Sequence, residues 1–219
     1  MSRTSLLASL LGFVSVLQFG YPITGYGELW TALYMVLYAV MLIFGLLVVH
    51  AEGETYRPLI AVTVVFLFTG TWFSLDQDST PAAVAMLVSV ALSMASLMFS
   101  LMRFVFRRGT VPGIDLVLAA ITAYLILGGL AAASFTLLEI AVPGSFEDPQ
   151  ADGPLVWQQL LYYSYVTVAT LGYGDVLPIT PWARSLGSLL SVAGTLYLTV
   201  IVARLVGIWS SSRDDAARG

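Results

Sequence analysis

Long apolar runs alternate with short polar connections along most of the chain. Six runs are long enough to cross a bilayer as helices, because a span needs about 20 predominantly apolar residues. They lie at about Ser5–Ile23, Leu29–Val49, Pro58–Leu75, Ala82–Met102, Ile114–Leu138 and Ser185–Trp209. A shorter apolar run, about Leu155–Ala169, precedes the last of them. The pattern predicts an all-α membrane protein with six transmembrane helices and one apolar segment that enters the membrane without crossing it.

The first run is the weakest of the six predicted spans. It is short and is interrupted by Gln18, Gly20 and Pro22. A signal peptide is the alternative, since Met1-Ser2-Arg3 is a weakly positive start. We favour a span, because no small-x-small cleavage site ends the run.

Basic residues predict the orientation of the spans. With the amino terminus inside, eight of the nine basic residues, all Arg, fall at cytoplasmic ends, and only Arg184 falls outside. The eight are Arg3, Arg57, Arg103, Arg107, Arg108, Arg204, Arg213 and Arg218. The tryptophans agree, with Trp30, Trp72, Trp157 and Trp182 near the outer boundary and Trp209 near the inner one. We expect a multi-pass protein of the plasma membrane with both termini in the cytoplasm.

Composition supports a lipid environment. The 219 residues are 58% hydrophobic and 10% charged, and the mean hydropathy is +0.89. The net charge of -4 gives no support to nucleic-acid binding, and the absence of Cys excludes disulfides and thiolate metal sites. An enzyme is disfavoured, because the spans lack a cluster of acids or His, and their Ser and Thr residues have no neighbouring base.

A break in the helical pattern divides the chain near Arg107–Asp115, where Gly109, Pro112 and Gly113 interrupt it. We predict a four-helix transmembrane domain at 1–108, a pore domain at 109–209 and a disordered cytoplasmic tail at 210–219. Within the pore domain, Pro154 suits the first position of a helix that runs to about Ala169. Such a helix covers about 22 Å, so it must enter the membrane and turn back.

The turn after this short helix is Thr170-Leu171-Gly172-Tyr173-Gly174-Asp175. This stretch resembles the selectivity filter of the potassium channels, Thr-Val-Gly-Tyr-Gly-Asp, in which backbone carbonyls replace the water around the ion. The two glycines allow backbone angles that L-residues resist. The resemblance implies that Thr170, Leu171, Gly172, Tyr173 and Gly174 bind potassium ions as the transported cargo.

One such loop cannot surround an ion, and the resemblance implies a homotetramer. A second Gly-Tyr-Gly, Gly25–Gly27, lacks a preceding short helix and the bulky residue between Thr and Gly, so we interpret it as a loop between spans. Residues 175–184, followed by Val192-Ala193-Gly194, look like the inner-helix region of two-helix bacterial potassium channels, which implies that Gly194 lies at the inner-helix hinge of that family. The stretch Leu196–Gly207 is similar to many bacterial six-span ion channels, and the whole resemblance covers about residues 113–209. Thr195, Leu198, Val202 and Val206 recur at helical spacing and face either the central cavity or lipid.

Three positions depart from the family pattern. Leu171 replaces the usual Val, Ala169 a common second Thr, and Val166 an acid that some relatives carry behind the filter. Asp175 therefore cannot form an acid pair with residue 166. The remaining candidates to hold Asp175 are Tyr162 and other groups of the short helix. The acids of Glu139–Gly153 either concentrate cations at the outer mouth or belong to an ordinary solvated loop.

The six-span layout raises the question of voltage sensing. Gating charges are several basic residues inside a span, yet Ala82–Met102 contains none, and Arg103, Arg107 and Arg108 follow it at the cytoplasmic edge. We therefore predict a passive, potassium-selective channel with weak or no voltage dependence. The alternatives are a weakly selective channel for monovalent cations and a membrane sensor or transporter with a vestigial pore.

Overall fold

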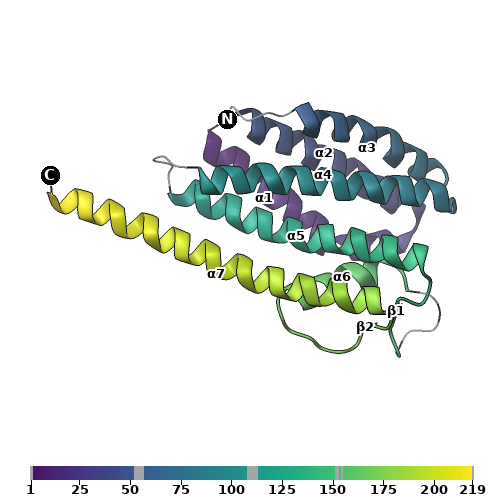
Figure 1. The fold of residues 1–219 in the computed structure, drawn as a ribbon. Helices are drawn as coiled ribbons and strands as arrows, with labels where there is room; N and C mark the ends of the chain where they lie inside the picture. The colour runs from purple at the N-terminus through teal and green to yellow at the C-terminus, as the bar shows by residue number, and fades with distance from the viewer. Residues whose placement is uncertain (1, 52–56, 108–112, 151–152, 154, 219) are drawn as a thin grey trace.

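The computed structural model describes residues 2–51, 57–107, 113–150, 153 and 155–218, with side chains described up to residue 208 and at 210. Predictions for Arg108, Asp152, Pro154 and the side chains of Trp209, Arg213 and Arg218 lie outside the described residues. Almost all of the described chain is helical (Figure 1). In chain order the elements are α1 (Arg3–Phe19), η1 (Tyr21–Tyr26, a 3-10 helix), α2 (Glu28–Ala51), α3 (Arg57–Leu75), α4 (Thr80–Phe106), α5 (Gly113–Ala141), β1 (Phe146–Glu147), α6 (Trp157–Val168), β2 (Leu177–Pro178) and α7 (Pro181–Arg218).

Five helices in the described part of the chain are long and apolar enough to cross a membrane. They are α2, α3, α4, α5 and the segment Pro181–Ile208 of α7. The prediction of an all-α membrane protein is confirmed. The helix α1 is apolar but has 17 residues, about 25 Å of helix, and it packs against α5 and α2. The sixth span therefore stays a prediction.

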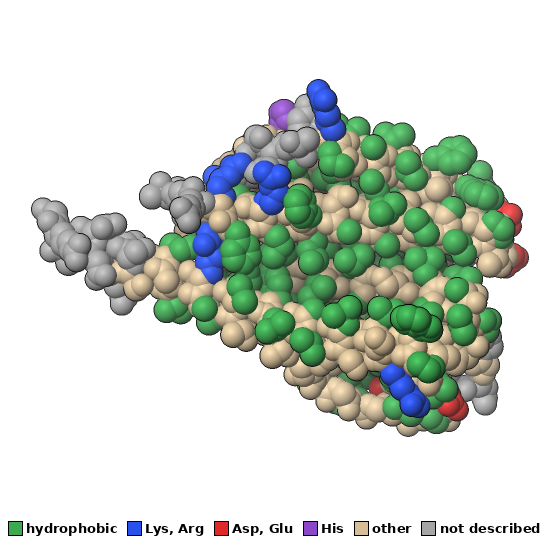
Figure 2. Space-filling model, viewed as in Figure 1, with side chains coloured by type: hydrophobic (Ala, Val, Ile, Leu, Met, Phe, Trp, Pro, Cys, Tyr) green, Lys and Arg blue, Asp and Glu red, His purple; other side chains and the backbone are tan. Residues whose placement is uncertain are grey.

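Successive long helices run in opposite directions, so the connections fall at two ends of a bundle (Figure 1). The start of α1 and the end of α7 lie at the same end. In the matching view of Figure 2, most of the visible Arg side chains gather at that end, while the visible Asp and Glu side chains lie at the opposite end. Apolar side chains cover the surface between the two. This distribution is the one that a membrane-spanning bundle requires, because charged groups in hydrocarbon are costly.

The core consists of two clusters of buried apolar side chains, and α5 contributes to both. The larger cluster joins α1, α2, α3, α4 and α5, with Leu10, Leu42, Leu97 and Ile126 fully buried. The smaller cluster joins α5 to α6 and α7 through aromatic contacts such as Phe135 with Tyr163, whose ring centroids are 5.2 Å apart. The helix α5 therefore holds the short helix α6 against the rest of the bundle.

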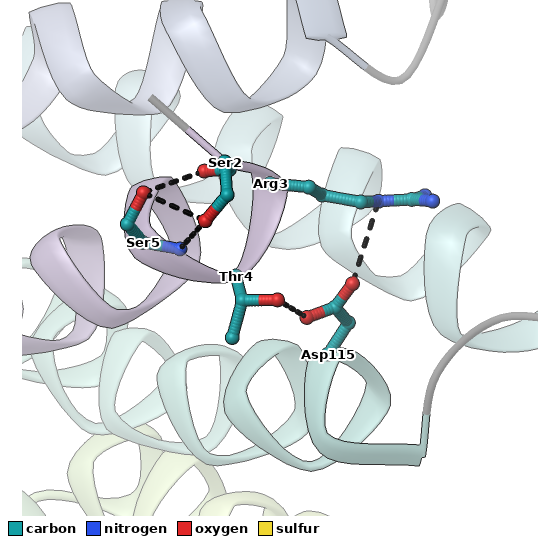
Figure 3. A network of polar contacts seen from close by, with 5 residues as sticks. All are labelled: Ser2, Arg3, Thr4, Ser5 and Asp115. Atoms are coloured by element: carbon teal, nitrogen blue, oxygen red, sulfur yellow. Dashed lines mark hydrogen bonds and ion pairs between the residues drawn. The ribbon is translucent and has the colours of Figure 1, made fainter.

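A buried carboxylate at the start of α5 fixes the position of α1. The residue Asp115 is 1% exposed, and its side chain accepts a hydrogen bond from Thr4 Oγ1 at 2.7 Å (Figure 3). Arg3 Nε lies 3.9 Å from the other carboxylate oxygen, and the Arg3 guanidinium lies 4.6 Å from the centroid of the Phe104 ring on α4. The amino end of α5 also favours an anion through its dipole. Three helices therefore meet at this one acid.

A second polar contact joins α7 to the end of α4. Arg204 donates from Nε to the carbonyl oxygen of Val105 at 2.5 Å and from an Nη to that of Arg107 at 3.0 Å. Its guanidinium also lies 5.1 Å from the centroid of the Phe106 ring. The last carbonyls of a helix have no partner within the helix, and Arg204 supplies donors to this end of α4.

The helix α7 is longer than the predicted last span. It continues as one helix through Arg218, over the segment that we predicted to be disordered. No Gly or Pro follows Gly207 until the end of the chain, so nothing in that stretch of sequence breaks the helical backbone. The division of the chain into 1–108, 109–209 and 210–219 stays a prediction.

We expect the substitution Thr4→Val to destabilise the fold, because it leaves the buried Asp115 carboxylate with one donor fewer. Removing one partner of a buried group costs about 1–3 kcal/mol. Thermal unfolding of the purified protein in detergent measures the effect. Thr71→Val is the matched control, since the exposed Thr71 hydroxyl donates only to Leu67 of its own helix. Equal melting temperatures for the two variants would contradict the structural role of Asp115.

Candidate ion-conducting site

The short helix α6 positions the candidate site. It begins at Trp157, three residues after the predicted first position at Pro154, and the extended Val156 is its N-cap. The Val156 N–H donates to Gln159 Oε1 at 3.0 Å, which fixes this first turn. The 12 residues of α6 cover about 18 Å, so α6 cannot cross the membrane. Its carboxyl end leads directly into the glycine-containing loop.

The end of α6 is closed by two backbone hydrogen bonds that reverse the chain. Leu171 N–H donates to the Val166 carbonyl at 2.9 Å, and Thr170 N–H donates to the Thr167 carbonyl at 3.0 Å. This pattern is the Schellman motif, in which one residue takes a left-handed conformation that Gly usually supplies. Here that residue is Thr170, with φ of 57°. A β-branched residue in this region is strained, and such strain concentrates at functional sites.

Left-handed residues then alternate along the loop. Gly172 has φ of 61° and Gly174 has φ of 75°, so every second residue from Thr170 onward lies in the left-handed region. In an ordinary strand successive carbonyls point to opposite sides. Changing the hand at every second residue removes this alternation, which allows neighbouring carbonyl oxygens to face one side. Ideal Cβ atoms at both glycines meet nothing within 4 Å, so the backbone angle, rather than space, requires Gly there.

The loop is not covered by its own chain. Residues 169–174 are all exposed, with the Leu171 side chain 58% and the Tyr173 side chain 67% exposed. Within one chain, the exposed Tyr173 side chain therefore does not pack so as to support the loop. The predicted site residues Thr170, Leu171, Gly172, Tyr173 and Gly174 thus form a contiguous exposed stretch at the end of α6.

A hydrogen bond from α6 holds the outer end of the loop. Tyr162 donates its hydroxyl proton to Asp175 Oδ2 at 2.5 Å, and the N–H of Val176 donates to Oδ1 at 2.9 Å. Of the two predicted options, Tyr162 or another group of the short helix, the structure shows Tyr162. The bond from Tyr162 lowers the pKa of Asp175, and the same bond raises the pKa of Tyr162 to about 12. The carboxylate form of Asp175 is therefore the one that this contact stabilises.

The connection from α5 to α6 is fastened to the chain that follows the loop. The strands β1 and β2 pair antiparallel, and the Ile179 N–H donates to the Ser145 carbonyl at 2.8 Å. Glu139 accepts from the N–H groups of Gly144 at 2.8 Å and Phe146 at 3.0 Å. Asp148 accepts from Gln159 Nε2 at 3.0 Å. The carboxylates of Glu139 and Asp148 therefore hold this connection in place through hydrogen bonds.

The carboxyl end of α6 lies against α7 and α5. An ideal Cβ on Gly194 meets the Val168 carbonyl oxygen at 2.4 Å, so only Gly allows α7 to approach this closely. From α5, Tyr124 donates its hydroxyl proton to the same carbonyl at 3.2 Å. The helix α7 runs through Gly194 without interruption. The role of Gly194 as the inner-helix hinge stays a prediction. The close contact between Gly194 and Val168 was not predicted from the sequence.

Aromatic hydroxyls connect the same three helices and were not predicted. Tyr165 of α6 donates to the Leu125 carbonyl at 2.7 Å, and its ring occupies the space that a Cβ on Gly128 needs. Tyr197 of α7 donates to the Ala120 carbonyl of α5 at 2.6 Å. The small residues of α5 therefore admit α6 closely, as small residues do between membrane helices.

The four residues predicted to face the cavity or lipid, Thr195, Leu198, Val202 and Val206, are exposed in the single chain. Either environment fits this exposure. The second Gly-Tyr-Gly differs from the first in structure, since Tyr21–Tyr26 forms the 3-10 helix η1 and only Gly27 has a positive φ. It therefore lacks the alternation found at residues 170–174.

Comparison with known proteins agrees with this part of the structure. Residues 120–210 match the model of a protein family described as "Ion channel". This segment is therefore similar to an ion channel domain. The match includes most of α5, all of α6, the loop and α7 up to Ser210, and it covers less than half of the chain. This similarity favours transport over catalysis. No solved structure matches the chain.

The substitution Tyr162→Phe is expected to raise the pKa of Asp175, because the hydroxyl that stabilises its carboxylate is lost. In the unaltered protein, the contact stabilises the loop at any pH above the ordinary carboxyl pKa and is lost as the pH falls through the lowered value. The variant should therefore lose ion flux at a higher external pH during acidification.

Liposome flux at stepped external pH measures that midpoint. Tyr163→Phe serves as the matched control, because Tyr163 lies on the same helix and packs against Phe135 and Phe146. An unchanged midpoint in Tyr162→Phe would show that this contact does not set the protonation of Asp175.

The substitution Gly194→Ala should destabilise the pore region by about 1–3 kcal/mol, the usual cost of overpacking. Its new methyl group meets the Val168 carbonyl, so α7 must move away from α6. Gly207→Ala is the control on the same helix, since its Cβ meets nothing within 4 Å and Ala favours helix over Gly. Thermal melts should place the first variant below and the second at or above the unaltered protein. The reverse order would contradict the close approach.

Proposed function

We propose that this protein is a potassium-selective channel whose pore forms from four copies of the chain. The supporting observation is the alternation of left-handed residues at Thr170, Gly172 and Gly174 directly after a short helix. This backbone lets consecutive carbonyl oxygens face one side, and neutral carbonyls are the ligands that replace the hydration shell of potassium. Potassium ions are the cargo, and the peptide oxygens of Thr170 to Gly174, with the Thr170 hydroxyl, are their ligands.

The need for further copies follows from exposure. A carbonyl row on one side of one loop cannot enclose an ion, and the side chains of Leu171 and Tyr173 are more than half exposed. The helix α7 is the least buried of the candidate spans, with 17% of its most apolar window buried. Four chains around an axis would cover α7 and brace Tyr173 against a neighbouring chain. The chain then acts as a homotetramer in the bilayer.

The electrostatics of the mouth fit a cation. The carboxylate of Asp175 lies at the outer end of the loop, and the carboxyl end of α6 brings the negative end of its dipole to the inner end. In α4, by contrast, the basic residue Arg103 lies in the last turn. We therefore place conduction in the pore region and assign α4 no gating charge within the membrane. The expected orientation places both termini in the cytoplasm.

The substitution Gly172→Ala is expected to abolish selective potassium flux, because Ala resists the φ of 61° that the carbonyl row requires. Purified protein in liposomes is measured for potassium and sodium uptake, and its size is measured in detergent. Gly25→Ala is the matched control, since it also changes the first Gly of a Gly-Tyr-Gly and its Cβ meets nothing within 4 Å. The control should keep the flux of the unaltered protein.

Three results would argue against the proposal. Sodium rejection that survives in Gly172→Ala would remove the loop from its role in selectivity. Equal permeation of potassium and sodium in the unaltered protein would favour a weakly selective cation channel, in which Leu171 changes the filter. Absence of flux together with absence of a tetramer would favour a sensor or transporter with a vestigial pore.

A further inference from the structure

A cavity of about 540 Å³ lies between the first helices and the start of α6. Its walls come from α2, α4 and α5, from the connection between α3 and α4, and from residues 155–161. This volume is in the range of pockets that hold small molecules, about 300–1,000 Å³. The ion-conducting loop at residues 170–174 contributes nothing to the lining, so the cavity is distinct from the candidate pore.

The cavity is elongated and mainly apolar. On α4 its lining extends from Ala83 to Met94, about 16 Å along the helix. Met35, Met86 and Leu161 contribute flexible or branched apolar side chains to it. Such a space suits an alkyl chain, since Met adapts to ligands of irregular shape.

The polar groups of the lining restrict the head of an occupant. No Lys, Arg or His is among the described residues that line the cavity, and its one acid is the exposed Asp78 at the end near the α3–α4 connection. An anionic head would meet no cation there and would face a carboxylate. The charges of the lining therefore disfavour fatty acids and anionic lipids.

A hydrogen-bond acceptor in the wall lacks a donor. Gln158, in the first turn of α6, donates from Nε2 to Thr24 Oγ1 at 3.1 Å. Thr24 gives its own hydroxyl proton to the Tyr21 carbonyl at 2.7 Å, so it must accept from Gln158, and the amide orientation is thereby fixed. The buried Oε1 of Gln158 has no partner among the described residues. A buried carbonyl in this state favours a ligand that brings a donor.

We propose that this cavity binds an uncharged amphiphile whose alkyl chain lies along α4 and whose head hydroxyl donates to Gln158. The class is that of lipid alcohols with a free hydroxyl. Bound there, the molecule contacts α6 at Gln158 and Leu161, within the helix that carries the candidate pore loop. Binding does not depend on potassium selectivity, so the two proposals can fail separately.

Photolabelling of the full-length protein in lipid nanodiscs tests the site. The probe is a dodecanol analogue with a diazirine in its chain, and labelled residues are mapped by mass spectrometry. Dodecanol, dodecylamine and dodecanoate compete at equal concentrations, which separates neutral, cationic and anionic heads of the same length. We expect labels on cavity residues of α4 or α6 and strongest competition by dodecanol.

Two variants with matched controls locate the contacts. Gln158→Leu should weaken competition by dodecanol about three- to tenfold, as expected for one lost hydrogen bond, while the exposed Gln150→Leu should not. Ala83→Leu should abolish labelling by filling the cavity, while Ala91→Leu, also half-buried on α4 but outside the lining, should not. Melting curves verify that each variant is folded.

Labels outside the cavity, or stronger competition by dodecylamine or dodecanoate than by dodecanol, would overturn the proposal. Unchanged affinity in Gln158→Leu or unchanged labelling in folded Ala83→Leu would also overturn it.

Discussion

The arrangement of this protein depends on a backbone constraint at the end of α6. Three residues in left-handed conformation, at positions 170, 172 and 174, occur in a stretch whose side chains are largely exposed. A short peptide in water does not hold such angles, and Thr170 resists its own. The constraint is maintained from both sides, by the Schellman hydrogen bonds at the inner end and by Tyr162 with Asp175 at the outer end. The surrounding helices fix the positions of these two sets of contacts.

The helix α5 supports the contacts at both ends of the loop. Its small residues let Tyr165 approach, and Tyr124 reaches the last carbonyl of α6, while its first turn is fixed to α1 by Asp115. The outer end of α5 leads into a connection that is fastened by Glu139 and by the pairing of β1 with β2. One helix thus links the four-helix part, the short helix and the outer loops. An element with this many partners tolerates little bending, which suits a site that needs constant spacing.

Sequence reasoning predicted most of the fold, because apolar periodicity and length depend on each segment alone. The boundaries of α2 to α5 agree with the predicted spans within a few residues, and the short helix lies where the apolar run was too short to cross. The loop after it was predicted from its resemblance to a potassium-channel filter, and Tyr162 as the partner of Asp175 was among the predicted options. The contacts of Asp115, Arg204 and Gly194 were not predicted, although Gly194 was expected at the family hinge and Arg204 at a cytoplasmic end. Each of these contacts joins segments that lie far apart in the sequence: Thr4 and Asp115 are separated by 111 positions and Arg204 and Val105 by 99. Local pattern carries no information on such pairings.

The contact of Arg204 has a mechanical consequence for α7. The Arg204 guanidinium donates to the carbonyl oxygens of Val105 and Arg107 at the end of α4. A rotation of α7 about its own axis moves the guanidinium away from both oxygens. A rigid tilt of both helices together, by contrast, keeps both bonds. The two hydrogen bonds therefore couple a displacement of α7 at this end of the bundle to the end of α4.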